Sequence, residues 1–264
     1  MTCTKSARFA VFPLVLLLSS LAIFFASPAL AADPDDRPAG FRFHAPRIFI
    51  GGHAGMNFPQ ADSDFYSFLT SNLTLQKSDF RGPFIGFDVG VPIHPHFALV
   101  GTFDYGRVSP QSEFRHFVED NGNPITQTTR FSQISLIGTL RYYPWKMGET
   151  VGSYAWVPRR ILPYVAGGAG MIHYNLTQFG DFVDSTTYNI FSATFESNDY
   201  GLIKHAAAGV DIGITSRVFA NLEGRYSFAN AGWPPNRWGL TDFRGYRPLD
   251  LSGLKLIGGI YFRF

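Results

Sequence analysis

The chain has 264 residues, of which 16% are charged and 16% are aromatic, and its formal net charge is +2. This near-neutral balance gives no support to nucleic-acid binding, which would require a clear basic excess. The single cysteine is Cys3, so the rest of the chain has no thiol for a disulfide, a thiolate metal site or a cysteine nucleophile.

Residues 1–31 have the pattern of a cleaved secretion signal. Lys5 and Arg8 form a basic start, residues 9–26 are an apolar core, and Ala29-Leu30-Ala31 offers small residues for cleavage. An uncleaved membrane anchor is the alternative, but prolines at positions 13 and 28 argue against it. We expect a short, flexible periplasmic lead-in over 32–46 and one domain over 47–264.

Beyond this signal no run of about 18 apolar residues remains, so only a closed barrel of strands could cross a membrane. The final segment shows the alternation of such a strand. One face carries Leu254, Leu256, Gly258, Ile260, Phe262 and Phe264, and the other carries Lys255, Ile257, Gly259, Tyr261 and Arg263. Apolar residues on one face, polar residues on the other and terminal aromatics are typical of a membrane-spanning barrel strand.

Seven earlier segments show a comparable pattern and bring the expected number of strands to eight. In the second of them, for example, Ile85 and Phe87 are expected to point outward and Asp88 inward. The fifth segment, 163–176, is too rich in glycine for its faces to be assigned. The eight expected strands are 47–58, 82–93, 97–108, 131–143, 163–176, 203–215, 218–228 and 249–264.

The expected connections differ in length between the two rims. Four are long, at 59–81, 109–130, 177–202 and 229–248, whereas 94–96 and 216–217 are tight turns. Long loops on one rim and tight turns on the other are typical of bacterial outer-membrane barrels. The pattern predicts both termini in the periplasm and the long loops outside the cell. The connection 144–162 departs from it, and its role stays open; resting on the periplasmic membrane face is one option.

A soluble barrel with an apolar interior is the alternative fold, because it would show the same alternation. The polar faces consist of Gly, Ser, Thr and Asn with scattered charges, whereas a soluble exterior would carry more Lys and Glu. We therefore predict an all-β protein, an eight-stranded antiparallel up-and-down transmembrane β-barrel.

Three segments, 163–170, 208–213 and 251–264, resemble the eight-stranded outer-membrane β-barrel superfamily. This superfamily includes the OmpA transmembrane domain, OmpW and the opacity-type porin-like surface proteins. The resemblance implies a place in the bacterial outer membrane, contact with lipids and lipopolysaccharide, and insertion by the barrel-assembly machinery. The end formed by Tyr261, Phe262 and Phe264 is similar to the C-terminal assembly signal of such barrels. No cofactor is implied.

An eight-stranded barrel encloses a lumen that side chains can fill. The inward charged residues are expected to form an internal ion-pair network of Asp88, Asp104, Arg141, Asp211, Glu223, Arg225 and Lys255. A barrel plugged in this way would have a structural role or act at the surface through its long loops. The alternative is a narrow pore, or a lateral path for small hydrophobic solutes, as the resemblance to OmpW suggests.

Enzymatic and metal sites have weaker support. Lipid A deacylases are similar barrels with a His-x-Ser pair on the lipid face of a strand, but here Ser227 and Ala229 stand in those two places. A serine without a base within reach is inactive, so we expect no enzyme. His94 and His96 flank a proline in a turn, and two imidazoles without a third ligand make a weak metal site.

The connection 229–248 is the candidate surface-binding loop. It combines prolines with aromatic and arginine residues, which are common anchors at binding hot spots. The candidates are Trp233, Arg237, Trp238, Arg244 and Tyr246. The alternative is that the aromatics pack on the membrane rim while the arginines meet lipopolysaccharide phosphates.

Overall fold

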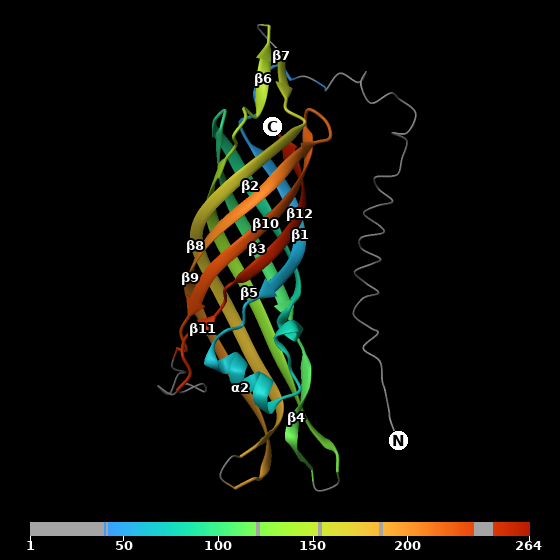
Figure 1. The fold of residues 1–264 in the computed structure, drawn as a ribbon, viewed down its shortest axis with the longest axis vertical. Helices are drawn as coiled ribbons and strands as arrows, with labels where there is room; N and C mark the ends of the chain where they lie inside the picture. The colour runs from blue at the N-terminus through green and yellow to red at the C-terminus, as the bar shows by residue number, and fades with distance from the viewer. Residues whose placement is uncertain (1–39, 41, 120–121, 153–154, 185–186, 235–244) are drawn as a thin grey trace, which may run out of the picture. The chain divides into compact units, whose positions relative to one another are not determined.

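The computed structural model describes residues 40, 42–119, 122–152, 155–184, 187–234 and 245–264. The predicted signal, 1–31, and most of the predicted lead-in lie outside the described residues. Eight strands form a closed antiparallel ring, in which each strand pairs with its neighbour in the ring's order and the last pairs with the first (Figure 1). They are β1 (Phe49–Pro59), β2 (Gly82–His94), β3 (Phe97–Val108), β5 (Pro124–Tyr142), β8 (Ile161–Val183), β9 (Ile190–Gly213), β10 (Val218–Ala231) and β12 (Gly253–Arg263).

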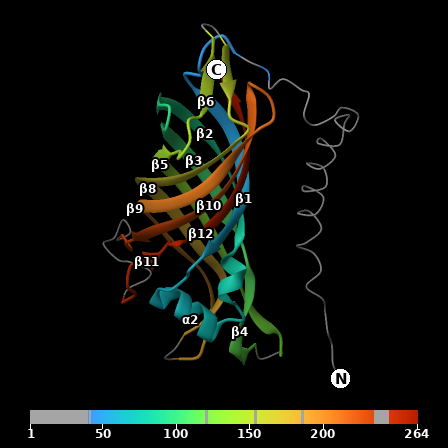
Figure 2. The same cartoon turned by 45° about the horizontal axis from the view of Figure 1, so that its top comes forward.

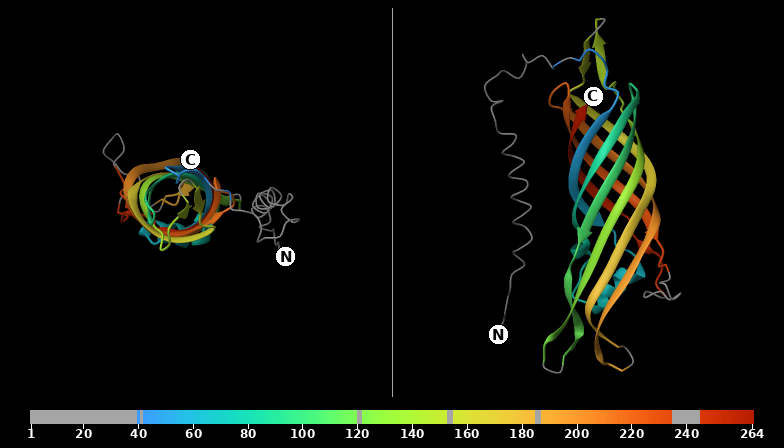
Figure 3. Two further views of the ribbon diagram at one scale, coloured as in Figure 1. Left: turned by 90° about the horizontal axis from the view of Figure 1, so that it is seen from above. Right: turned by 180° about the vertical axis from the view of Figure 1, so that it is seen from behind.

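The view along the barrel shows the closed ring directly (Figure 3). Closure is made by the pairing of β12 with β1, whose register runs from Phe49 opposite Arg263 to Pro59 opposite Gly253. A closed ring leaves no unpaired strand edge, which is the condition for strands to cross a lipid layer. The predicted fold class is confirmed.

Side chains alternate across the wall as the sequence predicts. On β2, Ile85 is 62% exposed and Asp88 only 1%. On β8, where no faces could be assigned, Tyr164 and Tyr174 are buried inside while Val165 and Met171 are exposed outside. Glycine is required inside this strand because a Cβ on Gly168 would lie 2.4 Å from the backbone oxygen of Gly138 on the next strand.

The outer surface of the ring is apolar. Large hydrophobic side chains are exposed on most strands of the wall, among them Ile85, Leu99, Leu136, Val165, Leu222 and Leu256. Such a contiguous apolar surface is unfavourable in water and matches the lipid-facing band of a membrane barrel. Among the described residues, no helix is long and apolar enough to span a membrane.

The predicted long loops 109–130 and 177–202 are wrong in large part, because strands occupy most of both. β8 and β9 continue until Val183 pairs with Ile190. Between β3 and β5 lies β4 (Gln111–Val118), which pairs back on an extended β5. These extensions carry polar residues on both faces, as strands surrounded by water can, so the alternation that revealed the membrane-spanning part fades there.

The predicted loop 59–81 contains a helix, α2 (Asp64–Asn72), and a 3₁₀ turn, η1 (Lys77–Phe80). The helix buries Phe65, Tyr66 and Leu69, which share one face because residues four apart lie one turn apart. It ends where the Leu73 N–H donates to the Leu69 carbonyl. α2 lies across one end of the barrel, which we call the loop end (Figures 1 and 2).

The other end, which we call the hairpin end, holds the tight turns, Phe264 and a small separate hairpin (Figure 1). This hairpin, β6 (Gly148–Val151) and β7 (Ala155–Pro158), accounts for the unexplained connection 144–162. Its outer edge pairs with Arg42 through two backbone hydrogen bonds to Trp156. At the loop end, β11 (Leu249–Asp250) adds a short pairing to β10.

Candidate functional site: the filled lumen and its cover

The lumen at the hairpin end is filled by an aromatic layer. Phe219 stacks on Tyr261 with ring centroids 5.1 Å apart, and Phe49 meets Phe219 edge-on at 5.6 Å. These rings are carried by β1, β10 and β12, whose ends meet at this rim. The buried members of the layer are Phe49, Ala98, Val100, Tyr143, Leu162, Tyr164, Phe219 and Tyr261.

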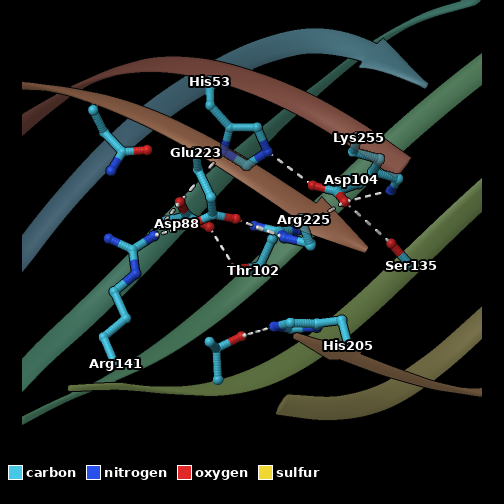
Figure 4. Close-up of polar contacts among 12 residues, drawn as sticks. His53, Asp88, Thr102, Asp104, Ser135, Arg141, His205, Glu223, Arg225 and Lys255 are labelled. Atoms are coloured by element: carbon cyan, nitrogen blue, oxygen red, sulfur yellow. Dashed lines mark hydrogen bonds and ion pairs between the residues drawn. The ribbon is translucent and has the colours of Figure 1, made fainter. Parts of the chain in front are cut away.

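The central lumen holds charged side chains around Asp104 (Figure 4). The Asp104 carboxylate accepts hydrogen bonds from Lys255 Nζ at 2.7 Å and from Arg225 at 3.3 Å. His53 Nε2 lies 2.8 Å from the other carboxylate oxygen. Asp104 is 2% exposed, so both cations are paired with it away from water.

A second centre lies around Glu223. Arg225 Nε donates to its carboxylate at 2.8 Å and Arg141 lies 3.4 Å away. Arg141 in turn lies 3.6 Å from Asp88. The structure thus joins six of the seven predicted network residues in one chain of ion pairs, in the order Lys255, Asp104, Arg225, Glu223, Arg141 and Asp88.

The seventh predicted residue, Asp211, is also buried in the lumen but is held by neutral donors. Asn221 Nδ2 donates to it at 2.7 Å and the Tyr143 hydroxyl at 3.1 Å. Neutral donors also complete the other carboxylates: Tyr164 donates to Glu223, and both Thr102 and Tyr261 donate to Asp88, each at 2.5 Å. Every carboxylate of the network therefore has a hydroxyl or amide donor, a cation, or both.

Sequence reasoning missed these neutral partners as part of the site. Tyr143 and Thr102 alternate with outward residues on their strands, so the alternation of the sequence could have identified them. Tyr164 lies on the strand whose faces were unassigned. Tyr261 was associated with the assembly signal, whereas the structure places it wholly inside the lumen, 0% exposed. His53 also belongs to the site: its Nε2 hydrogen-bonds Asp104 at 2.8 Å and its Nδ1 lies 3.4 Å from Asp88.

Ser227, the serine of the deacylase comparison, faces the lumen and is 3% exposed. It lies opposite His205 in the pairing of β10 with β9, and the His205 Nε2 interacts with Thr139 Oγ1 at 3.2 Å. The catalytic serine of a deacylase would lie on the lipid face instead. In the turn at the hairpin end, the rings of His94 and His96 are 5.8 Å apart, and the described residues contain no group of three ligands placed to hold a metal ion.

At the loop end, α2 and η1 form an apolar cover over the lumen. Phe65, Tyr66 and Leu69 of α2 and Phe80 of η1 pack with inward residues of the wall such as Tyr174. Burial raises the pKa of Tyr66 well above its usual range. The cover and the wall residues that it contacts form one buried cluster of Ala61, Phe65, Tyr66, Leu69, Leu73, Leu75, Phe80, Phe131, Ile137, Ile172, Tyr174, Leu176, Ile203, Ala229, Ala231, Leu249 and Leu251.

Two residues of the candidate surface loop belong to this packing. Trp233 meets Phe65 with centroids 5.3 Å apart, and Tyr246 meets the same ring at 5.9 Å. Both rings therefore pack on α2, which neither the free binding loop nor the membrane-rim alternative anticipated. Arg237, Trp238 and Arg244 lie outside the described residues.

An exposed ion pair ties the same loop to the helix. Arg247 donates two hydrogen bonds to the Asp64 carboxylate, at 2.8 and 2.5 Å. The guanidinium holds the pKa of Asp64 below its usual range. Arg247 also accepts, through its backbone carbonyl, a 2.8 Å hydrogen bond from Trp233 Nε1.

Between the network and the cover lies a small cavity of about 30 Å³, lined by Asp104, Lys255, Phe80 and Ile172 among others. Such a volume has room for roughly two water molecules. The lumen is thus occupied in three successive zones: the aromatic layer, the ion-pair network and the cover.

No protein-family model and no curated protein sequence matches the chain. Solved structures similar to it include the outer membrane protein OprG of Pseudomonas aeruginosa, at 13% identity over 86% of this chain and 99% of that one, with a TM-score of 0.44. Another is Ail, the attachment invasion locus protein of Yersinia pestis, at 11% identity over 83% and 97%, with a TM-score of 0.40.

The outer membrane protease OmpT of Escherichia coli is also similar in structure, at 8% identity over 86% of this chain and 99% of that one, with a TM-score of 0.36. The chain's own strand pairing and apolar outer surface establish its architecture. The chain is an eight-stranded antiparallel transmembrane β-barrel.

Proposed function

We propose that this protein is an integral outer-membrane barrel with a closed lumen, whose role is structural or depends on interactions at the loop end. The observation that supports it most strongly is the occupation of the lumen from one rim to the other. Conduction requires a continuous aqueous path, and the cavity that touches the network measures only about 30 Å³.

The network is costly to open because its members are buried together. Arg141 and Arg225 are 1% and 2% exposed, and each lies near two carboxylates. Moving one partner away leaves a buried charge unpaired, which costs about 3–5 kcal/mol. Thermal motion therefore opens this zone rarely.

In this proposal the loop end faces the outside of the cell and the hairpin end faces the periplasm. The supporting pattern is the one typical of outer-membrane barrels, with tight turns at one rim and long segments at the other. Lipids and lipopolysaccharide would then surround the wall, and the barrel-assembly machinery would insert it. A surface role would place its contacts on α2, β4 and the β8–β9 hairpin.

Conductance of the refolded barrel in a planar bilayer tests the closed lumen. The wild type should show no steady single-channel current. A double variant, Arg141→Ser with Glu223→Ser, removes an opposed pair from the network and should raise the frequency of openings. Steady current through the wild type would overturn the closed lumen and favour the narrow pore; a hydrophobic solute crossing without current would favour the lateral path.

Single cysteines test the orientation, in a Cys3→Ser background that has no other thiol. Val118→Cys lies at the loop end and Val151→Cys on the β6–β7 hairpin, and the native residues are 63% and 60% exposed. A maleimide that cannot cross membranes should label only the first on intact cells and both after lysis. The reverse labelling would invert the proposed topology.

A further inference from the structure

A separate cavity of about 400 Å³ lies at the loop end, beside the cover. This volume falls within the range of small-molecule pockets, about 300–1,000 Å³. Its walls come from α2, from β4 and from the extended β8–β9 hairpin, the parts of the chain that sequence reasoning treated as loops. Most of the lining is aromatic, including Phe65, Phe68, Phe114, Phe117, Phe182 and Phe195.

The cavity also contains a buried hydrogen-bond donor that has no partner in the part of the chain that the structure describes. Gln127 and Gln178 both line it and are 3% and 5% exposed. Gln178 Nε2 donates to Gln127 Oε1 at 2.8 Å, whereas Gln127 Nε2 has no hydrogen-bond partner among the described residues. Buried amide donors are nearly always paired, so an unpaired one in a cavity points to a missing acceptor.

The lining limits the charge of any occupant. The lining residues of the cavity, all within the described part of the chain, include no Asp, Glu, Lys or Arg, and their one imidazole is that of His116. A charged ligand would lose its hydration without gaining a counter-charge, which is strongly unfavourable. The occupant should therefore be neutral.

The arrangement of the rings favours a flat shape. Phe117 on β4 and Tyr188 beyond the end of β8 stack with centroids 5.8 Å apart and an angle of 27°. Phe182 and Phe195, on the two strands of the hairpin, meet edge-on at 4.7 Å. Aromatic rings in these offset and edge-on arrangements offer faces and edges for a further ring.

We propose that this cavity binds a neutral, flat ring molecule carrying one hydrogen-bond acceptor, which takes the free Gln127 Nε2 donor. The aromatic walls supply most of the affinity, and the amide selects for the acceptor. The site shares Phe65 and Leu73 with the cover but contains no residue of the ion-pair network or the aromatic layer, so the proposal does not depend on whether the barrel conducts.

Two probes that differ only in a hydrogen-bond acceptor test whether the cavity recognises that group. Prodan is a neutral naphthalene with one ketone, and 2-dimethylaminonaphthalene is the same ring system without it. Binding is measured from probe emission in nanodiscs that contain the barrel, after subtraction of empty nanodiscs of the same lipid. The wild type should bind the ketone about 5–10-fold more tightly. Equal affinity for the two probes, or emission no greater than in empty nanodiscs, overturns the proposal.

Gln127→Glu is the closest test of the amide, because it keeps the shape and the acceptor for Gln178 while removing the donor. It should abolish the preference for the ketone. A double variant, Gln127→Leu with Gln178→Leu, replaces both amides of the cavity lining with uncharged apolar side chains and should bind both probes with equal affinity. A ketone preference that survives in both variants would overturn the role assigned to Gln127.

The walls are tested by filling and by truncation. Phe195→Trp adds volume inside the cavity and should lower the affinity for both probes at least about tenfold. Phe117→Ala removes part of the aromatic wall and should also lower the affinity for both probes. Trp145→Ala, an aromatic truncation at the hairpin end, is the matched control and should leave binding unchanged. If the control lowers binding as much as Phe117→Ala does, the probes bind elsewhere and the proposal fails.

Discussion

The ion-pair network and the cover occupy two zones of the same lumen and are held there by different physical means. In the network, the three strands β3, β5 and β10 bring Asp104, Arg141, Glu223 and Arg225 together, and each contact joins opposite charges on buried side chains. In the cover, the apolar face of the short helix α2 packs against inward residues of the wall at the loop end of the barrel. The first is part of the wall itself, and the second rests on the wall.

Because of this difference, the network should govern the stability of the whole barrel, whereas the cover should govern access to the lumen. Network residues are carried by strands that must pair for the ring to close, so weakening the network should destabilise the whole barrel. The cover is carried by the segment between β1 and β2, so α2 can loosen without a strand leaving the ring. Local opening of weakly attached elements is a general property of folded proteins.

Asp104→Asn should have the largest effect, because it removes the counter-charge of Lys255 and one of the two counter-charges of Arg225 without changing the side chain's shape. We expect a loss of about 3–5 kcal/mol in the free energy of unfolding, measured by urea titration of the barrel in lipid vesicles. Asp62→Asn is the matched control: its ion pair with Lys77 is exposed, so little change is expected. Equal effects of the two variants would contradict the buried network.

Leu69→Ala should weaken the cover while leaving the barrel folded. Leu69 is 0% exposed in the apolar cluster, and truncating a buried leucine costs about 2–5 kcal/mol. The loss should appear as faster amide hydrogen exchange in α2, with the exchange of the wall strands unchanged. Ser71→Ala, on the exposed side of the helix, should leave exchange unchanged. Collapse of the whole barrel in Leu69→Ala would show that network and cover are one cooperative unit.

Leu222→Arg tests the face assignment on which the network depends. Leu222 is 56% exposed and alternates with the inward Glu223, so an arginine there would face lipid at a cost of about 2–4 kcal/mol. Val118→Arg, outside the apolar band, should be tolerated. Unchanged stability of Leu222→Arg in vesicles would mean that the outward face of β10 does not meet lipid.

The barrel was predictable because lipid and a narrow lumen impose opposite demands on alternate residues. That alternation located all eight strands of the ring and the inward position of Asp88, Asp104 and Glu223. It failed on β8, where glycines such as Gly168 replace the side chains that would mark a face. The glycines are needed there because neighbouring strands and the His205 ring come too close for a Cβ.

The cover was not predictable in the same way. The spacing of Phe65, Tyr66 and Leu69 fits a helix face, but a nine-residue helix is marginal by itself and is stabilised by the wall beneath it. Likewise, nothing local shows that Trp233 and Tyr246 would pack on Phe65, since that contact joins segments far apart in the chain. The aromatic cavity depends on the same long-range contacts.

Asp64→Asn should have the smallest effect, because its ion pair with Arg247 lies at the surface, where charge pairs contribute little. The Asp64 pKa is lowered in the folded state, so the contribution of the pair is present above the unfolded value of about 3.9 and is lost as the pH falls through the folded value. The wild type should therefore hold α2 slightly better than Asp64→Asn at neutral pH and low salt. The difference should shrink below about pH 4 and at high ionic strength. Hydrogen exchange in α2 at neutral pH and in two salt concentrations, with Trp233 emission followed down to acid pH, measures both trends. A difference that grows on acidification would show that the carboxylate does not act through Arg247.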